Sequence, residues 1–535
     1  MHIKRISIFL IVIFLLIGCS ANTANTPDAT PVPVETESGT RSVREPWWRD
    51  AVFYEIFVRS FYDSNGDGIG DFNGITEKLD YIESLGVNAI WLMPIHPSPS
   101  YHGYDVTNYY SVNHEYGSLE DFKRLIDEAH KRDIRIIIDL VLNHTSSQHP
   151  FFADANSGQN STYRDWYVWS ETAAGGQWHK GNEGYYFGLF WGGMPDLNYR
   201  NPDVTRQMEN VTRYWLEDMG LDGFRIDAAK HLIEDGAIVE NTPATHEWFK
   251  NYFSYYKSVN ENAYTVGEVY GAGAFIATTY DQQFDHIFNF EVASGIVNSV
   301  KGGSNTGINS AWKFTLKDIQ DGNYATFLTN HDQNRVMSEL NGDMDKAKLA
   351  AFMLLTAPGT PFIYYGEEIG MAGKKPDEDI RLPMQWDNSA NSGFSVATPW
   401  RTVNPDFKNV NVISQENNTN SLLNHYKALI NIRKQYSTLR TGSTYLLETG
   451  NTGVYAIIRS DDAGLFLVLA NLKNETILDY QLSLKENILP EKSFMLINVY
   501  GSEDGAQLNI LNGKFDEYKP LTQLPPYSIN LFRLE

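Results

Sequence analysis

From residue 46 onward, short apolar runs alternate with longer segments of helical periodicity, and this alternation limits the fold more than any other feature of the chain. Several runs are apolar at almost every position, as a strand that is covered on both faces requires. Alternating strands and helices predict a parallel α/β architecture, closed as a (β/α)₈ barrel, over residues 46–143 and 199–438. The predicted strands are 52–58, 89–95, 135–142, 223–227, 264–269, 324–330 and 361–367.

The segments between these strands carry apolar residues on one helical face. Ser118 is a suitable N-cap residue, and the apolar residues after it recur at helical spacing: Leu119, Phe122, Leu125, Ile126 and Ala129. A second stripe precedes the strand at 223–227 and consists of Val204, Met208, Val211 and Trp215. Both segments are therefore predicted to be amphipathic helices.

Two regions interrupt the alternation. Residues 144–198 are rich in Gly, Ser, Asn, Trp and Tyr and lack a helical period. Because such a stretch is too long for a simple loop, it predicts a small domain inserted after the third strand. Residues 439–535 contain alternating segments such as 453–459 and 464–472, which predict a C-terminal antiparallel β-sandwich domain.

The N-terminus predicts export. Lys4 and Arg5 precede an apolar run at 6–17 that resembles a signal peptide and is short for a helix that spans a bilayer. The run leads to Gly18 and Cys19, which resemble a bacterial lipobox; a signal peptide with an incidental cysteine is the alternative. Cys19 is the only cysteine, so an intramolecular disulfide is excluded. We expect residues 1–18 to be removed, residues 19–45 to form a disordered tether, and acylated Cys19 to anchor the protein outside the cell.

The formal net charge of −23 argues against a nucleic-acid partner, because phosphate binding needs a basic surface. Neutral sugars or bound cations suit the chain better. Aromatic residues make up 13% of it, and rings with a polar edge suit a face that stacks on a ligand while it stays wet. Most of these rings are nevertheless expected in the core, and the protein is expected to be a monomer.

Two charged residues end the strand predicted at 223–227. Because side chains alternate along a strand, Arg225 and Asp227 share one face, near the carboxyl end, where barrel active sites lie. A structural ion pair is one interpretation. The other is a nucleophile, since a nearby guanidinium would keep Asp227 ionised, as a nucleophile must be.

Glu268 and Asp332 end two further apolar runs. The carboxyl ends of parallel strands gather at one end of a barrel, so these two acids are expected to converge there with Asp227. Apolar neighbours would raise the pKa of Glu268 and suit it to protonate a leaving group. Double displacement at a glycosidic carbon needs a pair of carboxyl groups about 5–5.5 Å apart.

Four segments together resemble the signature regions of the α-amylase family, glycoside hydrolase family 13, in order and spacing. They are 139–145 (DLVLNHT), 223–227 (GFRID), 265–269 (TVGEV) and 327–332 (FLTNHD), and 194–198 (MPDLN) resembles the family's fifth region. The resemblance extends from about residue 46 to residue 535. It implies a retaining glycoside hydrolase whose partner is an α-glucan polysaccharide or oligosaccharide.

The resemblance also implies a role for each matching residue. Asp227 matches the nucleophile, Glu268 the general acid/base, and Asp332 the residue that stabilises the transition state. The residues that match substrate-binding positions are His102, Tyr104, His144, Arg225, Lys230, His231, His331, Asp377 and Arg381.

Calcium, Ca²⁺, is the cofactor that the resemblance implies. Residues 63–71 carry oxygen donors at alternate positions with Gly68 for a sharp turn, but Gly74 stands where an EF-hand has its last glutamate. The loop resembles a calcium loop of oligo-1,6-glucosidase-like members, and a solvated turn is the alternative. Its expected ligands are Asp63, Asn65, Asp67, Ile69 and Asp71. A second site is implied where the inserted domain meets the barrel, at Asn143, Asp196 and the carbonyl of His231.

The sequence combines features of two groups within the family. Residues 381–387, 398–400 and 403–405 resemble oligo-1,6-glucosidases. Lys230 and His231 match α-amylases instead, and Met194 is typical of intermediate members. We therefore expect endo-hydrolysis of α-1,4 bonds in starch and maltooligosaccharides. The alternatives are an exo-acting oligo-α-glucosidase and a non-catalytic glucan-binding lipoprotein, which the three carboxylates disfavour.

Overall fold

The computed structural model describes residues 45–173, 175–271, 273–319 and 322–535. The chain divides into two units, and all described residues except Glu45 belong to the second, Pro46–Glu535. The expected signal peptide, the tether and Cys19 lie outside the described residues, so they stay predictions. Within the described ranges, no helix combines the length and the apolar character that crossing a bilayer requires.

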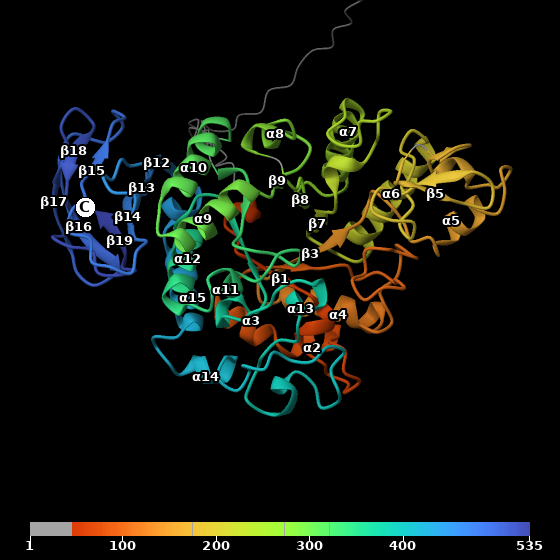
Figure 1. Ribbon diagram of the computed structural model, residues 1–535, viewed down its shortest axis with the longest axis horizontal. Coiled ribbons are helices and arrows are strands. Elements are labelled where there is room, and N and C mark those ends of the chain that lie inside the picture. Colours follow the sequence, from red (N-terminus) through yellow and green to blue (C-terminus); the bar gives the residue numbers. More distant parts are fainter. Residues whose placement is uncertain (1–44, 174, 272, 320–321) are drawn as a thin grey trace, which may run out of the picture. The chain divides into compact units, whose positions relative to one another are not determined.

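Eight parallel strands form the central sheet of the second unit (Figure 1). In sheet order they are β10 (Ala325–Thr326), β11 (Thr360–Tyr364), β1 (Phe53–Ile56), β2 (Ala89–Leu92), β3 (Arg135–Leu140), β7 (Gly223–Ile226), β8 (Tyr264–Gly267) and β9 (His286–Ile287). A parallel bridge between Phe288 and Ala325 connects the two outer strands, and the N–H of Asn289 donates to the carbonyl of Ala325 at 2.9 Å. The sheet is therefore a nearly closed barrel, which confirms the predicted fold class.

The sequence prediction lacks β9 and overestimates β10. Two residues are too few to show the period of a strand, so nothing in the local pattern marks His286–Ile287. The predicted run at 324–330 pairs only at Ala325 and Thr326 and then leaves the sheet before His331 and Asp332. Local hydrophobicity thus indicates where the chain is buried, while the length of a strand depends on its neighbours.

Helices follow most strands, and two of them match the predicted stripes. α4 (Leu119–His130) begins with a capping box between Ser118 and Asp121 and buries its predicted apolar face. α6 (Pro202–Arg213) continues as a π-helical turn, Tyr214–Asp218, and also buries its predicted stripe. The other longer helices are α7 (Pro243–Val259), α9 (Phe290–Gly302), α10 (Thr306–Asp318), α12 (Met344–Thr356) and α15 (Leu422–Gln435).

Short helices lie in the connections. They are α1 (Val58–Phe61), α2 (Phe72–Glu77), α3 (Leu79–Leu85), α5 (Pro150–Ala155), α8 (Ala274–Thr278), α11 (Val336–Glu339), α13 (Asp377–Ile380), α14 (Val412–Glu416) and α16 (Ser437–Thr441).

Residues 144–198 form a small unit between β3 and α6 (Figure 1). It contains α5 and an antiparallel sheet in the order β4 (Trp169–Ser170), β6 (Tyr185–Phe187) and β5 (Trp178–Lys180). Phe152 packs against Tyr167, Trp169 and Tyr186, so aromatic rings supply much of its core. A bridge between His144 and Asp196 brings the two ends of the insertion together beside β3.

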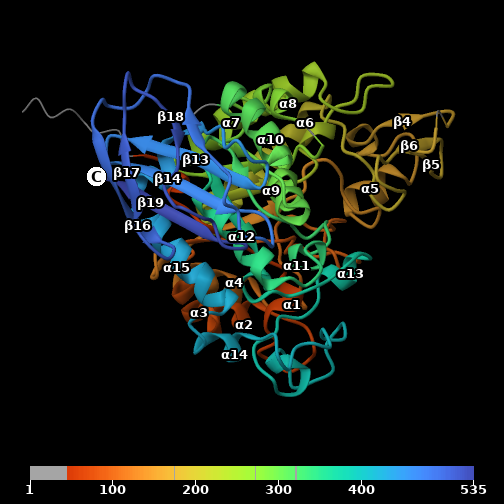
Figure 2. The ribbon, with the colours of Figure 1, turned by 60° about the vertical axis from the view of Figure 1, so that its left-hand side comes forward.

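The C-terminal segment forms an antiparallel sheet, whose strands Figure 2 shows side by side. Its order is β12 (Ser443–Leu446), β13 (Val454–Asp461), β14 (Gly464–Asn471), β19 (Ile529–Leu534), β16 (Ser493–Tyr500) and β17 (Gly505–Asn509). β15 (Leu482–Leu484) and β18 (Phe515–Tyr518) form a second, two-stranded sheet. Buried Arg459 on β13 donates to the carbonyls of Thr356 and Leu439, which attaches this domain to the helices of the barrel.

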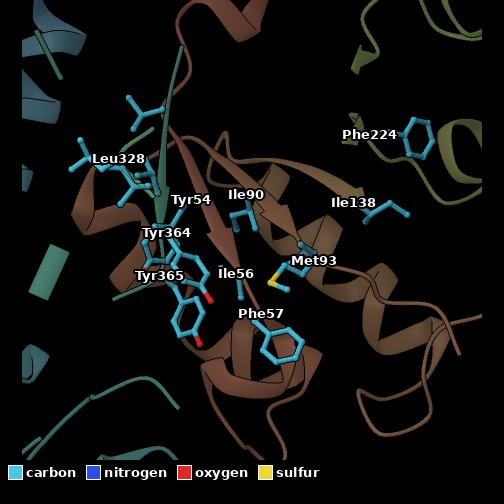
Figure 3. Packing of buried hydrophobic residues seen from close by; sticks show 14 of the residues in the cluster. Tyr54, Ile56, Phe57, Ile90, Met93, Ile138, Phe224, Leu328, Tyr364 and Tyr365 are labelled. Carbon is cyan, nitrogen blue, oxygen red and sulfur yellow. The ribbon is translucent and has the colours of Figure 1, made fainter. Parts of the chain in front are cut away.

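Side chains of the barrel strands alternate between the outer helices and the interior. On β1, Tyr54 and Ile56 face outward into the layer of Figure 3, whereas Phe53 faces inward. Phe53 stacks on Phe362 of β11 with ring centroids 4.2 Å apart, and Trp91 and Phe288 belong to the same interior cluster. The interior of the barrel at this level is therefore filled largely by aromatic side chains.

Candidate active site

Charged side chains lie on the inward face of the barrel, one strand step beyond the aromatic layer. Asp139 lies two residues after Ile137 on β3, so both side chains point into the barrel, and Asp139 pairs in register with Arg225 of β7. The guanidinium of Arg225 lies over the ring of Trp91, 5.4 Å from its centroid. Because every second side chain of a strand points inward, the apolar layer inside the barrel is followed by a layer of charged side chains.

Arg225 is the centre of this site. Its Nη1 donates to Asp139 and to Asp227, each at 2.7 Å, and its Nη2 lies 2.8 Å from Oε2 of Glu268. The guanidinium is almost completely buried, as are Asp139 and Asp227. One cation therefore holds three carboxyl groups at fixed positions at the ends of neighbouring strands.

Burial sets the pKa values of these acids. It raises the pKa of Asp227 and of Glu268, and Arg225 opposes the shift in both residues. Burial also raises the pKa of Asp139, to about 7, although Arg225 opposes this shift too. Arg225 thus acts on Asp227 in the predicted direction, toward the ionised form, and it offsets part of the rise in pKa that burial causes. The expected rise at Glu268 agrees with this site.

The backbone turns sharply after Asp227. Ala228 has a φ of 46°, in the left-handed region that residues with a Cβ atom rarely adopt. In this conformation its N–H donates to Oε2 of Glu268 at 3.0 Å. The strained turn thus connects the ends of β7 and β8 and orients the carboxyl group of Glu268.

Asp332 lies opposite, in a more open position. Its side chain is 43% exposed, compared with 11% for Asp227 and 13% for Glu268. Nη2 of Arg381 donates to Oδ1 of Asp332 at 2.9 Å, and Nε of Arg381 donates to the carbonyl of His331 at 3.0 Å. Burial opposes ionisation, but His331 and Arg381 together lower the pKa of Asp332. Asp332 is therefore an anion that faces the solvent.

The three acids line one cavity of about 330 Å³. This volume is in the range of pockets that bind small molecules or single sugar units. The other residues that line it are His102, Tyr104, His144, Phe190, Trp191, Met194, Ala228, Asp377 and Arg381.

Four predicted substrate-binding residues are not in the lining. Arg225 and His331 lie directly behind it, hydrogen-bonded to residues that line it. Lys230 forms an ion pair with Glu240 at 2.7 Å, and Nδ1 of His231 lies 2.8 Å from the carbonyl of Val239. The structure thus brings most of the predicted residues together. Lys230 and His231 instead contact other residues of the loop that follows β7.

Phe190 and Trp191 line the cavity and were not predicted from the sequence. They are 50% and 54% exposed, although both are large and apolar. A Cβ atom on Gly193 would lie 2.1 Å from Cζ2 of Trp191, so the indole ring rests directly on this glycine. Adjacent aromatic residues in the segment Gly188–Gly193 are a signal that could have identified them.

The predicted calcium loop at residues 63–71 is closed by its own hydrogen bonds. Asp63 accepts from the N–H groups of Gly66 and Gly68 at 2.7 and 2.8 Å, and Asp71 caps α2 by accepting from the N–H of Gly74 at 2.7 Å. Asn65 and Asp67 each accept from the N–H two residues further on, that of Asp67 and of Ile69. The oxygen donors are of the type that Ca²⁺ prefers. Their hydrogen bonds are equally those of a self-supporting turn, and calcium here stays a prediction.

The second predicted metal site, unlike the first, contains a buried oxygen atom without a hydrogen-bond partner in the described part of the chain. Oδ1 of Asn143 is buried and has no hydrogen-bond partner among the described residues, while Nδ2 of the same amide donates to Asp196 at 3.1 Å. The carboxyl group of Asp196 also contacts that of Glu234, and burial raises the pKa of both. Asp196 is buried and Glu234 is half-buried, and two adjacent carboxyl groups in such a place repel each other when both are ionised. The donor set of Asn143, Asp196 and Glu234 therefore fits a hard divalent cation.

Comparisons with known proteins identify the family of the chain. The family model described as "Alpha amylase, catalytic domain" matches residues 55–442. Alpha-amylase 3 of Dictyoglomus thermophilum is 41% identical over 86% of this chain and 93% of its own length. An oligo-1,6-glucosidase of Parageobacillus thermoglucosidasius is 31% identical over 86% of this chain and 96% of its own.

Among solved structures, the α-amylase from H. orenii superposes with a TM-score of 0.77 at 40% identity. The match covers 91% of this chain and 99% of that structure. The match of the family model spans the barrel strands from Glu55 onward and includes all three acids of the cavity. The chain is a glycoside hydrolase of the α-amylase family, family 13.

Proposed function

We propose that this hydrolase cleaves internal α-1,4 bonds of starch-like glucans by double displacement. Glu268 protonates the glycosidic oxygen while Asp227 attacks the anomeric carbon, which forms a β-glucosyl-enzyme. Glu268 then takes a proton from water, and the water displaces Asp227 to give a product with retained α configuration. Asp332 accepts hydrogen bonds from sugar hydroxyls. The convergence of all three acids on one cavity supports these roles.

The open side of the cavity is the observation that carries the endo assignment. An endo-acting enzyme must hold glucose units on both sides of the cleaved bond, whereas an exo-acting enzyme closes one side. Here Asp332 is 43% exposed, and Phe190 and Trp191 each present about half of their surface at the rim. Aromatic rings of this kind stack on the apolar faces of sugars and extend the binding surface beyond one unit.

A second candidate is an exo-acting oligo-α-glucosidase. One wall of the cavity carries charges that could close it, because Asp377 forms ion pairs with both Lys375 and Arg381. The segment 381–387, which resembles oligo-1,6-glucosidases, begins at this wall. These ion pairs lie on one side, as an exo-acting enzyme requires, but the exposed rings of Phe190 and Trp191 extend the binding surface and favour the endo-acting candidate.

The two candidates differ in their products. On soluble starch we expect rapid loss of iodine colour and a mixture of maltooligosaccharides at early times, with much slower release of glucose from isomaltose. The measurement is chromatography of products against time on starch, pullulan and isomaltose. Glucose as the sole early product from starch, with faster cleavage of isomaltose, would establish the exo-acting alternative.

We further propose that Ca²⁺ binds between the inserted domain and the barrel at Asn143, Asp196, the carbonyl of His231 and Glu234. Glu234 was not predicted from the sequence. The unpartnered Oδ1 of Asn143 and the contact between the carboxyl groups of Asp196 and Glu234 support this set. Bound there, the cation would neutralise buried Asp196 and half-buried Glu234 and hold Asp196 of the insertion against the barrel.

Calcium is expected to raise the melting temperature of the wild-type protein. At 100 times its Kd a ligand stabilises by about 2.7 kcal/mol. For a unit of this size that corresponds to about 2–3 °C, at about 2.1 cal/mol/K of unfolding entropy per residue. In Glu234→Gln the rise should be smaller, while the melting temperature in EDTA should equal or exceed that of the wild type, because the repulsion between Glu234 and buried Asp196 is gone.

Glu240→Gln is the matched control, since Glu240 lies in the same loop and pairs with Lys230 at the surface. It should respond to calcium as the wild type does. Differential scanning calorimetry in EDTA and in excess CaCl₂ measures all three proteins. An unchanged calcium response in Glu234→Gln would remove Glu234 from the ligand set.

A further inference from the structure

Glu55 is a buried acid to which neither the sequence nor the mechanism above gives a role. It lies on β1, two residues after Phe53, and is 2% exposed. Because side chains alternate along the strand, it faces the barrel interior just beyond the aromatic layer. An isolated carboxylate in such a place is strongly destabilising, so a partner is required.

The partner is His331, 276 residues away in the chain. Oε1 of Glu55 lies 2.5 Å from Nδ1 of the imidazole, which is itself completely buried. On the other side of the ring, Nε2 lies 2.6 Å from the hydroxyl of Tyr104 and 3.3 Å from Oδ2 of Asp332. The imidazole therefore connects an acid inside the barrel to an acid that lines the cavity.

These contacts determine the form of the ring. A carboxylate accepts hydrogen bonds only, so Nδ1 carries a proton toward Glu55, and Asp332 favours a proton on Nε2 as well. Other groups also act on the ring. The edge of Trp91 lies at 5.4 Å between centroids, and the cation of Arg381 disfavours a second positive charge. The carboxyl groups of Asp139 and Asp227 interact with the ring as well and favour its charged form. Burial lowers the pKa of His331, but Asp332 and Glu55 more than compensate, and the net shift is upward.

We propose that Glu55 is a positioning residue that keeps His331 in its imidazolium form, so that a fixed positive charge stands beside Asp332 in the cavity. A neutral amide at position 55 could hold the ring in place equally well. A carboxyl group at position 55 adds a second acid, on the side of the ring opposite Asp332, that can balance a charge on the imidazole, which an amide cannot do. The inference rests on the glycosidase activity of this site but not on the choice of glucan.

The kinetic test separates His331 from Glu268. In a Glu268→Gln background, an α-glucoside with an activated leaving group needs no general acid. The alkaline limb of kcat/KM that remains contains His331 together with other buried groups such as Asp139, so the change that Glu55→Gln produces in this limb is what reports His331. Adding Glu55→Gln should move that limb to lower pH by about 1–3 units, the usual effect of one nearby opposite charge. A limb at the same pH in both proteins would overturn the proposal, because a purely structural Glu55 lowers kcat/KM equally at all pH values.

Glu368→Gln in the same background is the matched control. Glu368 is completely buried in the short 3₁₀ helix Glu367–Ile369 that follows β11, where it accepts hydrogen bonds from Tyr54 and Tyr81 rather than from His331. It should leave the limb unmoved. A shift as large as that of Glu55→Gln would show that any buried charge in the barrel has this effect, and would equally overturn the proposal.

A second measurement needs neither activity nor the Glu55 variant to fold. In ¹⁵N-histidine-labelled wild-type protein, the signals of His331 are identified by their loss in His331→Asn. Both ring nitrogens should have imidazolium shifts at pH 7. A neutral ring at pH 7 would refute the role of Glu55 even if the protein hydrolyses starch, and an imidazolium would support it even if another α-glucoside is the substrate.

Discussion

Asp227→Asn is expected to lower kcat/KM by on the order of 10⁵-fold on any α-glucoside that the protein cleaves. Asparagine has the same shape and its amide oxygen still accepts a hydrogen bond from Arg225, but it cannot attack the anomeric carbon. The site keeps its buried cation with one anion fewer, so a modest change of stability should accompany the loss. Initial rates and a thermal melt of the purified variant measure both effects.

Asp379→Asn is the control for this variant. Asp379 forms an ion pair with Arg401 at the surface and does not line the cavity. Its activity should remain within about twofold of the wild type, since exposed ion pairs contribute about 0–1 kcal/mol. If Asp227→Asn kept a tenth or more of the activity, Asp227 could not be the nucleophile.

Glu268→Gln should lower kcat/KM by about 10²–10⁴-fold on starch and far less on a substrate with an activated leaving group. Glutamine cannot donate a carboxylic proton to a glycosidic oxygen, and a good leaving group does not need one. The pH profile should change as well. Burial raises the pKa of Glu268, so the wild type keeps the acid form to a higher pH than an ordinary glutamate does, and its rate falls as pH rises through that pKa.

In Glu268→Gln this part of the alkaline limb should disappear. The measurement is kcat/KM against pH on maltooligosaccharides and on the activated substrate, and the two substrates serve as controls for each other. Equal losses on both would contradict the role of Glu268 as general acid, because a general defect of the site affects both substrates alike.

The local pattern of the chain predicts much of this protein. The barrel follows from apolar runs and helical stripes, and the capping box at Ser118 occurs where the sequence predicts a helix start. The acids at positions 227, 268 and 332 converge because each follows a strand, or a strand with a short extension, of one parallel barrel. Where the pattern is shortest the prediction fails, as at His286–Ile287, which form a strand only through their neighbours.

The sequence by itself determined the barrel, the family resemblance and the acids at the ends of its strands, because these depend on periodicity and on order along the chain. Only the tertiary structure decided what surrounds those acids. It joins Glu55 to His331 and Asp196 to Glu234, it raises the pKa of Asp227 despite Arg225, and it engages Lys230 and His231 outside the cavity lining. These features depend on burial and on contacts between distant residues. Folding brings such residues together through side-chain packing, which no local pattern encodes.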